Sequence, residues 1–156
     1  MHIRQGTVQE MQSLWKHAGS TLRFFSGNIQ SGNAEFWTVE KDSHLIGELY
    51  FFKRLSDVDF ANGQSRGYLC ALRIVKEHRA KGYGTKLLSH VLEHAAGSGF
   101  KEVAIGVEET EQANLRLYTR LGFTRQIKRC TLDPCDVDEQ RRPVSCGAFL
   151  LLMKSL

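Results

Sequence analysis

The stretch from Gly67 to Val107 constrains the fold of this 156-residue chain more than any other segment. It opens with a run of mostly apolar residues, Gly67–Val75, as expected of a strand in the middle of a sheet. After Gly84 the apolar residues recur at helical spacing instead, and they are Leu87, Leu88, Val91, Leu92 and Ala95. The apolar residues of the last part alternate as in a second strand, at Val103, Ile105 and Val107. This order predicts a βαβ unit, whose two strands run parallel.

The segments on either side of this unit add further strands and helices. Thr7 is expected to cap a helix that starts near Val8, because Glu10 follows at the spacing of a capping box. The apolar face of that helix would be formed by Met11, Leu14, Trp15 and Ala18. Two more helices are expected, over residues 20–29 and around Leu117. The remaining strands are expected over residues 2–7, 35–39, 45–53, 123–132 and 147–154, with polar loops over 56–65 and 133–145. The mixture predicts an α/β or α+β sandwich around a mixed sheet.

Composition and charge argue against several classes of protein. The formal net charge is +4 and the basic residues are scattered, so we expect no nucleic-acid partner. No stretch is apolar for long enough to span a bilayer, and the first residues do not resemble a signal peptide. We therefore expect no membrane association and a cytoplasmic location. The cysteines, which show no C-x-x-C spacing and so predict no metal site, are Cys70, Cys130, Cys135 and Cys146.

The loop between the first strand of the βαβ unit and its helix carries the clearest chemical signal. Gly82 and Gly84 let the backbone turn tightly and approach a ligand. The helix that follows starts with unpaired N–H groups and the positive end of its dipole, which together form an anion site. Arg79 and Lys81 add positive charge, so the expected ligand is a phosphate or pyrophosphate. The spacing fits neither a dinucleotide fingerprint, which needs a third glycine, nor a P-loop.

Two motifs in this region resemble the GCN5-related N-acetyltransferase (GNAT) superfamily. The first is R-x-x-G-x-G at residues 79–84, which resembles the pyrophosphate-binding signature of the superfamily. The second is the helical segment at residues 114–123, and the diagnostic resemblance covers residues 67–123. It implies a GNAT-like fold in one domain, residues 1–156. That fold has a mixed, mostly antiparallel sheet of about seven strands flanked by about four helices.

The resemblance also implies a cofactor and the residues that hold it. Acetyl-CoA would donate an acetyl group to an amine of a small molecule or a peptide. Backbone groups of Leu72, Arg73 and Ile74 would pair with its pantetheine arm. The residues around its pyrophosphate would be Arg79, Ala80, Lys81, Gly82, Tyr83, Gly84 and Thr85. Tyr118 would protonate the departing thiolate, and Asn114, on the same helix face, would hydrogen-bond the cofactor or a bridging water.

The general base stays open at this point. Tyr68 occupies the position at which some members of the superfamily carry a glutamate. Nearby substitutes in the chain are Glu77, His78, Glu108 and Glu109. A water relay would need none of them. Cys70 offers an acyl-cysteine route, but a thiol on a buried strand is usually inert, and direct attack by the amine is favoured.

The acceptor amine is open as well. The regions that hold it in the superfamily are rich in aromatic and acidic residues here, which suit a small cationic amine such as a polyamine or an aminoglycoside. These residues are Trp15, Phe24, Phe25, Phe36, Trp37, Asp57, Asp59 and the acidic cluster at 133–139. The alternatives are a peptide acceptor and a non-catalytic module that binds acyl-CoA. Because members of the superfamily often form dimers, the resemblance also allows a homodimer.

Overall fold

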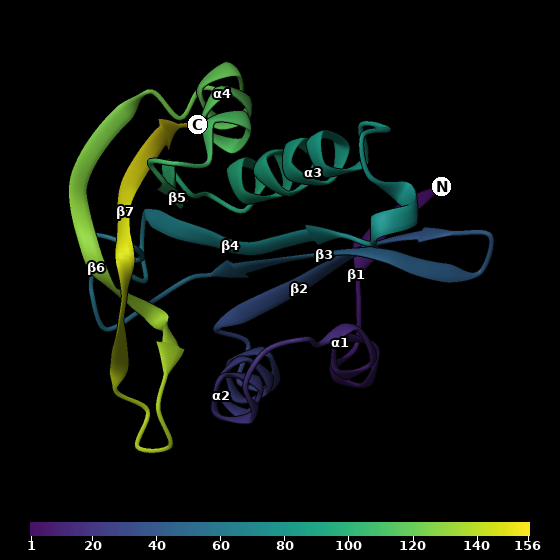
Figure 1. Ribbon diagram of the computed structural model, residues 1–156, viewed down its shortest axis with the longest axis horizontal. Coiled ribbons are helices and arrows are strands. Elements are labelled where there is room, and N and C mark those ends of the chain that lie inside the picture. The colour runs from purple at the N-terminus through teal and green to yellow at the C-terminus, as the bar shows by residue number, and fades with distance from the viewer.

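The computed structural model describes all 156 residues, and its seven strands form one sheet (Figure 1). The strands are β1 (His2–Gln5), β2 (Ala34–Lys41), β3 (His44–Phe52), β4 (Arg66–Ile74), β5 (Glu102–Glu108), β6 (Arg125–Val137) and β7 (Pro143–Ser155). The helices are α1 (Val8–Leu14), α2 (Gly19–Gln30), α3 (Tyr83–Gly97) and α4 (Gln112–Arg120), with a short 3₁₀ turn, η1 (Lys76–His78), before α3. The types of the elements and their order match those predicted from the sequence.

The sheet is mixed and mostly antiparallel, as predicted. Its strand order is β1-β2-β3-β4-β5-β7-β6, and only the β4–β5 pair is parallel. β4 lies at the centre of this order, which confirms the prediction of a central strand for Gly67–Val75. The parallel pair and the helix between them, α3, form the predicted βαβ unit.

Helices cover both faces of the sheet, α1 and α2 on one face and α3 and α4 on the other (Figure 1). Each face has its own apolar core. Met11 and Phe25 belong to the core under α1 and α2, and Leu88 and Tyr118 belong to the core under α3 and α4. No helix is both long enough and apolar enough to cross a membrane.

The first helix starts as predicted but ends earlier. Thr7 Oγ1 accepts a hydrogen bond from the Glu10 N–H at 3.1 Å, and Glu10 Oε1 accepts one from the Thr7 N–H at 2.9 Å, which completes the capping box. The helix ends at Leu14, and Trp15 is already extended, with φ −65° and ψ 130°. The prediction that Trp15 and Ala18 extend the apolar face of this helix is therefore wrong. Ala18 instead precedes α2.

The polar segment at 133–145 is not a loop, contrary to the prediction. β6 and β7 both extend into it, which leaves only residues 138–142 as the turn between them. Asp138 closes this turn by accepting two backbone N–H groups across it. The polar composition concealed a strand alternation, in which Cys135 is buried and its neighbour Asp136 is exposed.

A buried ion pair joins β3 to β4. Glu48 has no solvent exposure, and its Oε2 accepts hydrogen bonds from Nε and Nη2 of Arg73 at 3.0 and 2.7 Å. The Tyr50 hydroxyl donates to the other carboxylate oxygen at 3.2 Å, and Arg73 Nη2 also donates to the carbonyl of Leu14 at 2.8 Å. Burial raises the pKa of Glu48, while Arg73 acts in the opposite direction. The pair therefore ties the C-terminal half of β4 to β3 and to the end of α1.

Substitution of Arg73 by Met (Arg73→Met) should lower the free energy of unfolding by about 3–5 kcal/mol, because it leaves the Glu48 carboxylate buried without a counter-ion. The pKa of Glu48 in the folded variant then lies further above its unfolded value. The loss of unfolding free energy is therefore smallest at acid pH, where Glu48 is protonated in both the folded and the unfolded protein. It grows as the pH rises. Urea unfolding at a series of pH values measures both effects.

The matched control is Arg116→Met, which removes an exposed cation of α4 that forms no ion pair. It should change the free energy of unfolding by less than about 0.5 kcal/mol. A loss in Arg73→Met that equals that of the control, or that does not grow with pH, would contradict the assigned role of the pair.

Candidate functional site

β4 carries a bulge in the middle of the sheet. Two of its residues, Ala71 and Leu72, lie opposite the single residue Leu49 of β3. Ala71 has a φ of 56°, a left-handed conformation that costs a non-glycine residue about 1–2 kcal/mol. Bulges end regular pairing and are frequent beside active sites. The strained residue therefore marks this part of β4 as the start of a candidate site.

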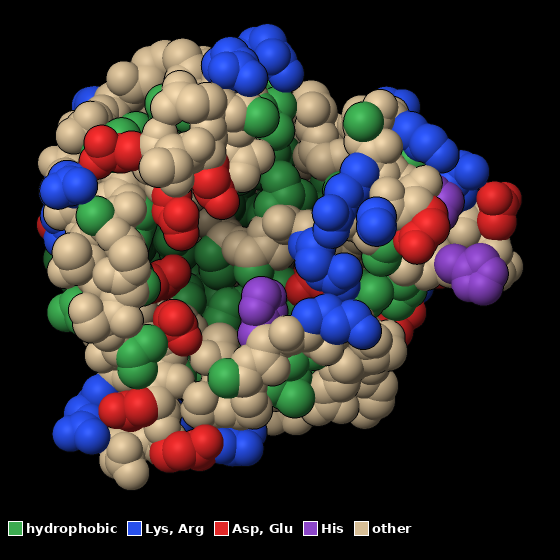
Figure 2. All heavy atoms as spheres, in the orientation of Figure 1, with side chains coloured by type: hydrophobic (Ala, Val, Ile, Leu, Met, Phe, Trp, Pro, Cys, Tyr) green, Lys and Arg blue, Asp and Glu red, His purple; other side chains and the backbone are tan.

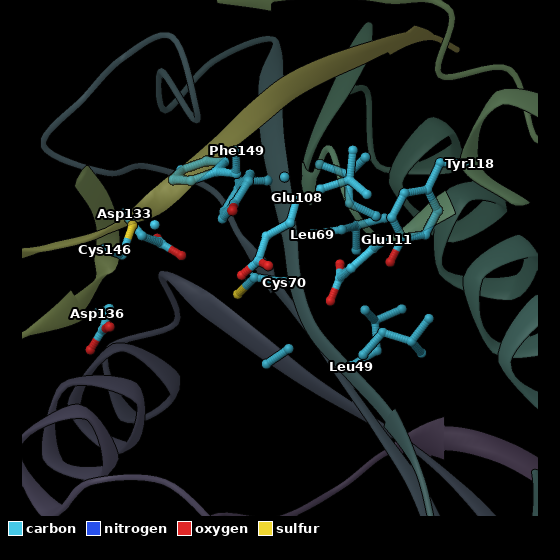
Figure 3. A pocket seen from close by; sticks show the side chains of 17 residues that line it. Leu49, Leu69, Cys70, Glu108, Glu111, Tyr118, Asp133, Asp136, Cys146 and Phe149 are labelled. Atoms are coloured by element: carbon cyan, nitrogen blue, oxygen red, sulfur yellow. The ribbon is translucent and has the colours of Figure 1, made fainter. Parts of the chain in front are cut away.

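The two parallel strands separate beside this bulge. β4 pairs with β5 only from Arg66 to Leu69, so residues 70–74 have no strand beside them on that edge. A cleft of about 310 Å³ opens there, lined also by α4 and by the hairpin of β6 and β7. Figure 2 shows it as a hollow with an apolar floor, and Figure 3 shows the side chains around it. The divergence thus exposes unpaired backbone groups of β4 along a cleft.

The loop before α3 ends in a row of open backbone N–H groups. No carbonyl or side chain of the protein accepts from the N–H groups of residues 80–85. They precede or begin a 15-residue helix, whose dipole adds positive potential. Arg79 Nε donates to the carbonyl of Ile74 at 2.8 Å and Lys81 Nζ to that of Glu77 at 3.3 Å, which holds both cations on this loop. Open N–H groups and two cations therefore gather on this loop, and the binding of an anion by them stays a prediction.

The two glycines of this loop have different roles in the backbone. Gly82 has a φ of 84° and precedes the first residue of α3, so a side chain at this position would be strained. Gly84 lies inside the first turn of the helix, where an added Cβ would make ordinary contacts with Ile74 at 3.7 Å and Leu72 at 3.9 Å. Only Gly82 is needed for the conformation of the loop.

Tyr118 of α4 faces the cleft (Figure 3). Its side chain is buried, with 6% of the residue exposed, and no protein group hydrogen-bonds its hydroxyl. Burial raises the pKa of Tyr118 to about 12, with a smaller contribution from the negative charge of Glu111. The hydroxyl therefore stays protonated at neutral pH and is available as a donor to a ligand.

The strand residues that were predicted to hold a cofactor differ in where their side chains lie. Leu72 lines the cleft. The side chain of Arg73 turns away to Glu48, and the carbonyl of Ile74 accepts from Arg79. All three residues lie on the part of β4 that has no strand beside it on the β5 side. This position suits the prediction that they act through backbone groups.

Asn114 lies one turn before Tyr118 on α4, on the same face. Its side-chain amide donates to Glu111 Oε2 at 3.4 Å, and it does not line the cleft. The structure therefore brings Tyr118, but not Asn114, to the wall of the cleft.

Four carboxylates line the cleft, and no Lys or Arg does. They are Glu108, Glu111, Asp133 and Asp136. Burial raises the pKa of Asp133, against the effect of a hydrogen bond from the Cys135 N–H at 2.8 Å. In Figure 2 acidic side chains gather on one wall of the hollow and basic ones on the opposite rim, the side on which α3 begins. One part of the site is thus suited to an anion and another to a cation.

Only one of the carboxylates predicted as a general base lines the cleft, and this is Glu108. Glu109 pairs with Arg129 at 2.7 Å, and Glu77 and His78 lie in η1 outside the cleft. Tyr68 lines the cleft, but burial raises its pKa well above the ordinary value, which makes the phenol a poor base.

Two other kinds of chemistry have little support. Burial raises the pKa of the Cys70 thiol, so this cysteine stays protonated and is a poor nucleophile, although it lines the cleft. The structure places no three His, Cys, Asp or Glu side chains where they could hold a metal ion together.

A second cavity, of about 420 Å³, adjoins the cleft. The two share four lining residues, Cys70, Ala71, Asp133 and Asp136, and therefore meet at the bulge of β4. The remaining walls come from the segment before α2, from α2 and from β6, and they are Trp15, His17, Ala18, Thr21, Phe25 and Cys135. Trp15, Phe25 and part of the predicted acidic cluster thus lie together, next to the cleft.

The other residues predicted to hold an acceptor lie elsewhere. Phe36 and Trp37 are buried in the two cores. Asp57 and Asp59 pair with Lys128 at 2.7 and 3.0 Å. Phe24 borders a separate hollow. Packing and ion pairing account for these residues without a ligand.

Three features of the site were not predicted: the bulge at Ala71, the ion pair of Glu48 beneath it, and Glu111 beside Tyr118. Glu48 did carry a signal, because a lone charge in the apolar run at 45–52 must find a partner. Nothing in the sequence marks an alanine as left-handed, and Glu111 looks like any polar residue before a helix.

Comparison with known proteins points to one family. The model of the acetyltransferase (GNAT) family matches residues 2–123. N-alpha-acetyltransferase 30 of Schizosaccharomyces pombe is 40% identical over 60 residues, which are 38% of this chain and 40% of that protein. The probable N-acetyltransferase camello of Xenopus laevis is 28% identical over 99 residues, 64% of this chain and 42% of that protein. The chain thus spans about two fifths of the length of these relatives.

Solved structures agree on the fold. A GNAT family acetyltransferase from Elizabethkingia anophelis, with acetyl-CoA bound, superposes with a TM-score of 0.71 at 18% identity, over 99% of this chain and 97% of the other. The family model covers most of the sequence, including both motifs, and the seven-stranded sheet is shared. The chain therefore belongs to the GNAT family of acetyltransferases.

Proposed function

We propose that this protein is an N-acetyltransferase that transfers acetyl directly from acetyl-CoA to a primary amine of a small molecule. The observation that carries the proposal is Tyr118, whose buried side chain lines the cleft and whose hydroxyl has no hydrogen-bond partner in the protein. The open N–H groups of residues 80–85 lie beside the cleft, since an added Cβ at Gly84 would be 3.9 Å from Leu72, which lines it. The family to which the chain belongs and the relatives named as N-acetyltransferases support it.

The residues present fit acetyl-CoA. The N–H groups from Ala80 to Thr85, with Arg79 and Lys81 beside them, would bind the pyrophosphate. The free edge of β4 at Leu72, Arg73 and Ile74 would pair with the amides of the pantetheine arm, as an added strand pairs with a sheet edge. Asn114 remains a candidate for a bridging contact, since its side chain lies one helical turn from Tyr118.

Bound acetyl-CoA would supply an activated acetyl group as a thioester. The protein has to orient the amine, take one proton from its nitrogen and give one to the departing sulfur. Tyr118 is suited to the second task, because its raised pKa keeps the phenol neutral until it donates. Glu108 is suited to the first, directly or through a water, because it is the candidate base that lines the cleft. The new C–N bond then replaces the C–S bond, with one proton lost and one gained.

A peptide N-terminus is the second candidate acceptor. It is favoured by the stronger of the two sequence relatives, which is named as an N-alpha-acetyltransferase. Release of free thiol from acetyl-CoA, measured with a panel of small amines and of short peptides, separates the two classes. A cytoplasmic location remains a prediction, in keeping with the four free cysteines.

Substitution of Gly82 by Ala (Gly82→Ala) should weaken the binding of acetyl-CoA by about tenfold. A left-handed alanine costs about 1–2 kcal/mol, and relaxation of the loop would misdirect the open N–H groups. Gly97→Ala is the control, because Gly97 lies at the other end of α3 and nothing lies within 4 Å of an added Cβ there, and it should bind nearly as the unchanged protein does. Isothermal titration calorimetry gives both affinities. Equal affinities for the two variants would show that the loop does not hold the cofactor in this way.

Replacement of Tyr118 by Phe should lower kcat by roughly a hundredfold or more and leave the affinity for acetyl-CoA nearly unchanged, since only the proton donor is lost. The rate of the unchanged protein should not fall from loss of the Tyr118 proton until the pH approaches about 12. Thiol release measured across pH tests both points. Tyr68→Phe, which removes another hydroxyl from the cleft, should have much less effect. Equal rates for the two variants would rule out Tyr118 as the acid.

A further inference from the structure

The carboxylates of the candidate site differ from most others in the protein. Of the 17 Asp and Glu residues, 11 form an ion pair with Lys, Arg or His. The exceptions are Glu77, Glu93 and the four that line the cleft, Glu108, Glu111, Asp133 and Asp136. In a chain with an excess of basic residues, these four gather without a single cation beside them in the cleft. The cleft therefore carries negative charge that no Lys or Arg in its lining balances.

Asp133 and Asp136 stand where the cleft and the second cavity meet. Figure 3 shows them across the cleft from Tyr118, with Glu108 between. Neither cavity is lined by Lys or Arg, and the single His17 is the only basic side chain in the second. A ligand that reaches from Tyr118 into the second cavity thus passes Glu108 first and the two aspartates next.

The second cavity adds aromatic side chains to this charge. Trp15 and Phe25 lie edge to face, with ring centroids 5.0 Å apart, and both line the cavity. Carboxylates together with aromatic rings favour an alkylammonium group, through Coulomb attraction and cation–π contact. The Tyr118 side chain, which is nine-tenths buried, points into the same cleft with no hydrogen-bond partner in the protein for its hydroxyl, so a polar ligand group is expected beside it.

The same charges disfavour other acceptors. An α-amino acid carries a carboxylate next to its amine, and neither cavity offers a Lys or Arg to pair with it. A monoamine would leave Asp133 and Asp136 without a partner once its single nitrogen lies near Tyr118. An acceptor with two ammonium groups can place one nitrogen near Tyr118 and the other beside Asp133 and Asp136.

We propose that the acceptor is an aliphatic diamine or polyamine, and that Asp133 and Asp136 bind the ammonium group that is not acetylated. This inference rests on the proposed acetyl transfer and specifies its substrate class. Glu108 and Glu111 then face the nitrogen that reacts, and the aspartates set the distance between the two nitrogens.

The test compares three acceptors with the same chain length, namely putrescine, butylamine and γ-aminobutyrate, with acetyl-CoA as donor. We expect kcat/KM for putrescine to exceed that for butylamine by about tenfold or more, and γ-aminobutyrate to give no turnover. The preference should shrink as ionic strength rises, because salt screens partly exposed charges. Equal kcat/KM for putrescine and butylamine, or faster turnover of γ-aminobutyrate, would overturn the inference while acetyl transfer to amines stands.

Asp136→Asn tests the assigned residues. Asp136 is exposed, and its removal is not expected to unfold the protein. The ratio of kcat/KM for putrescine to that for butylamine should fall towards one, mainly through KM for putrescine. Glu93→Gln is the control, since it removes the same charge from an unpaired carboxylate on α3 outside both cavities and should keep the ratio unchanged. An unchanged ratio in Asp136→Asn would contradict the assignment.

A failure of the proposed acetyl transfer would give a different result from a failure of the diamine inference. It would appear as bound acetyl-CoA with no thiol release for any amine or peptide. Calorimetric titration of the acetyl-CoA complex with putrescine still decides the inference in that case. Binding that Asp136→Asn weakens would support a dication site, and the absence of binding would overturn it.

Discussion

The site depends on one constraint of the backbone, which is the separation of β4 from β5 beyond Leu69. Parallel strands that stayed paired would use the backbone groups of residues 70–74 and close the sheet. The left-handed Ala71 and the extra residue in β4 turn this strand away from its neighbour. The buried pair of Glu48 and Arg73 then holds the diverging half against β3. The result is a cleft along which the edge of β4 at residues 70–74 has no neighbouring strand.

The rest of the site is arranged around that cleft by the βαβ connection. α3 must start near the end of β4 to cross back to β5, so its open N–H groups lie close to Leu72, which lines the cleft. α4 follows β5 and brings Tyr118 to the wall. The long hairpin of β6 and β7 supplies Asp133 and Asp136 from the far side. Charge is therefore separated along the site, with donors for an anion at one end and carboxylates for a cation at the other.

The sequence was most informative where local patterns and chain order decide the structure. The capping box at Thr7, the central position of Gly67–Val75 and the glycine turn that leads into α3 could all be predicted from local patterns and glycine spacing. The extent of β6 and β7 could not be predicted from composition. β6 continues through the polar residues at 133–136 and pairs again with β7 at Val137 and Pro143. The strain at Ala71 and the pairing of Glu48 depend on contacts between strands far apart in the chain, which one sequence does not display.

The most direct test of the account is a titration of the protein with acetyl-CoA, followed through its backbone amide resonances by NMR. If this cleft holds acetyl-CoA, binding is one-to-one, with the largest shifts at residues 80–85 and along β4 at residues 70–74, because open N–H groups there gain acceptors. Binding that leaves these amides unmoved, or no binding at all, would contradict the assignment of this cleft as the acetyl-CoA site.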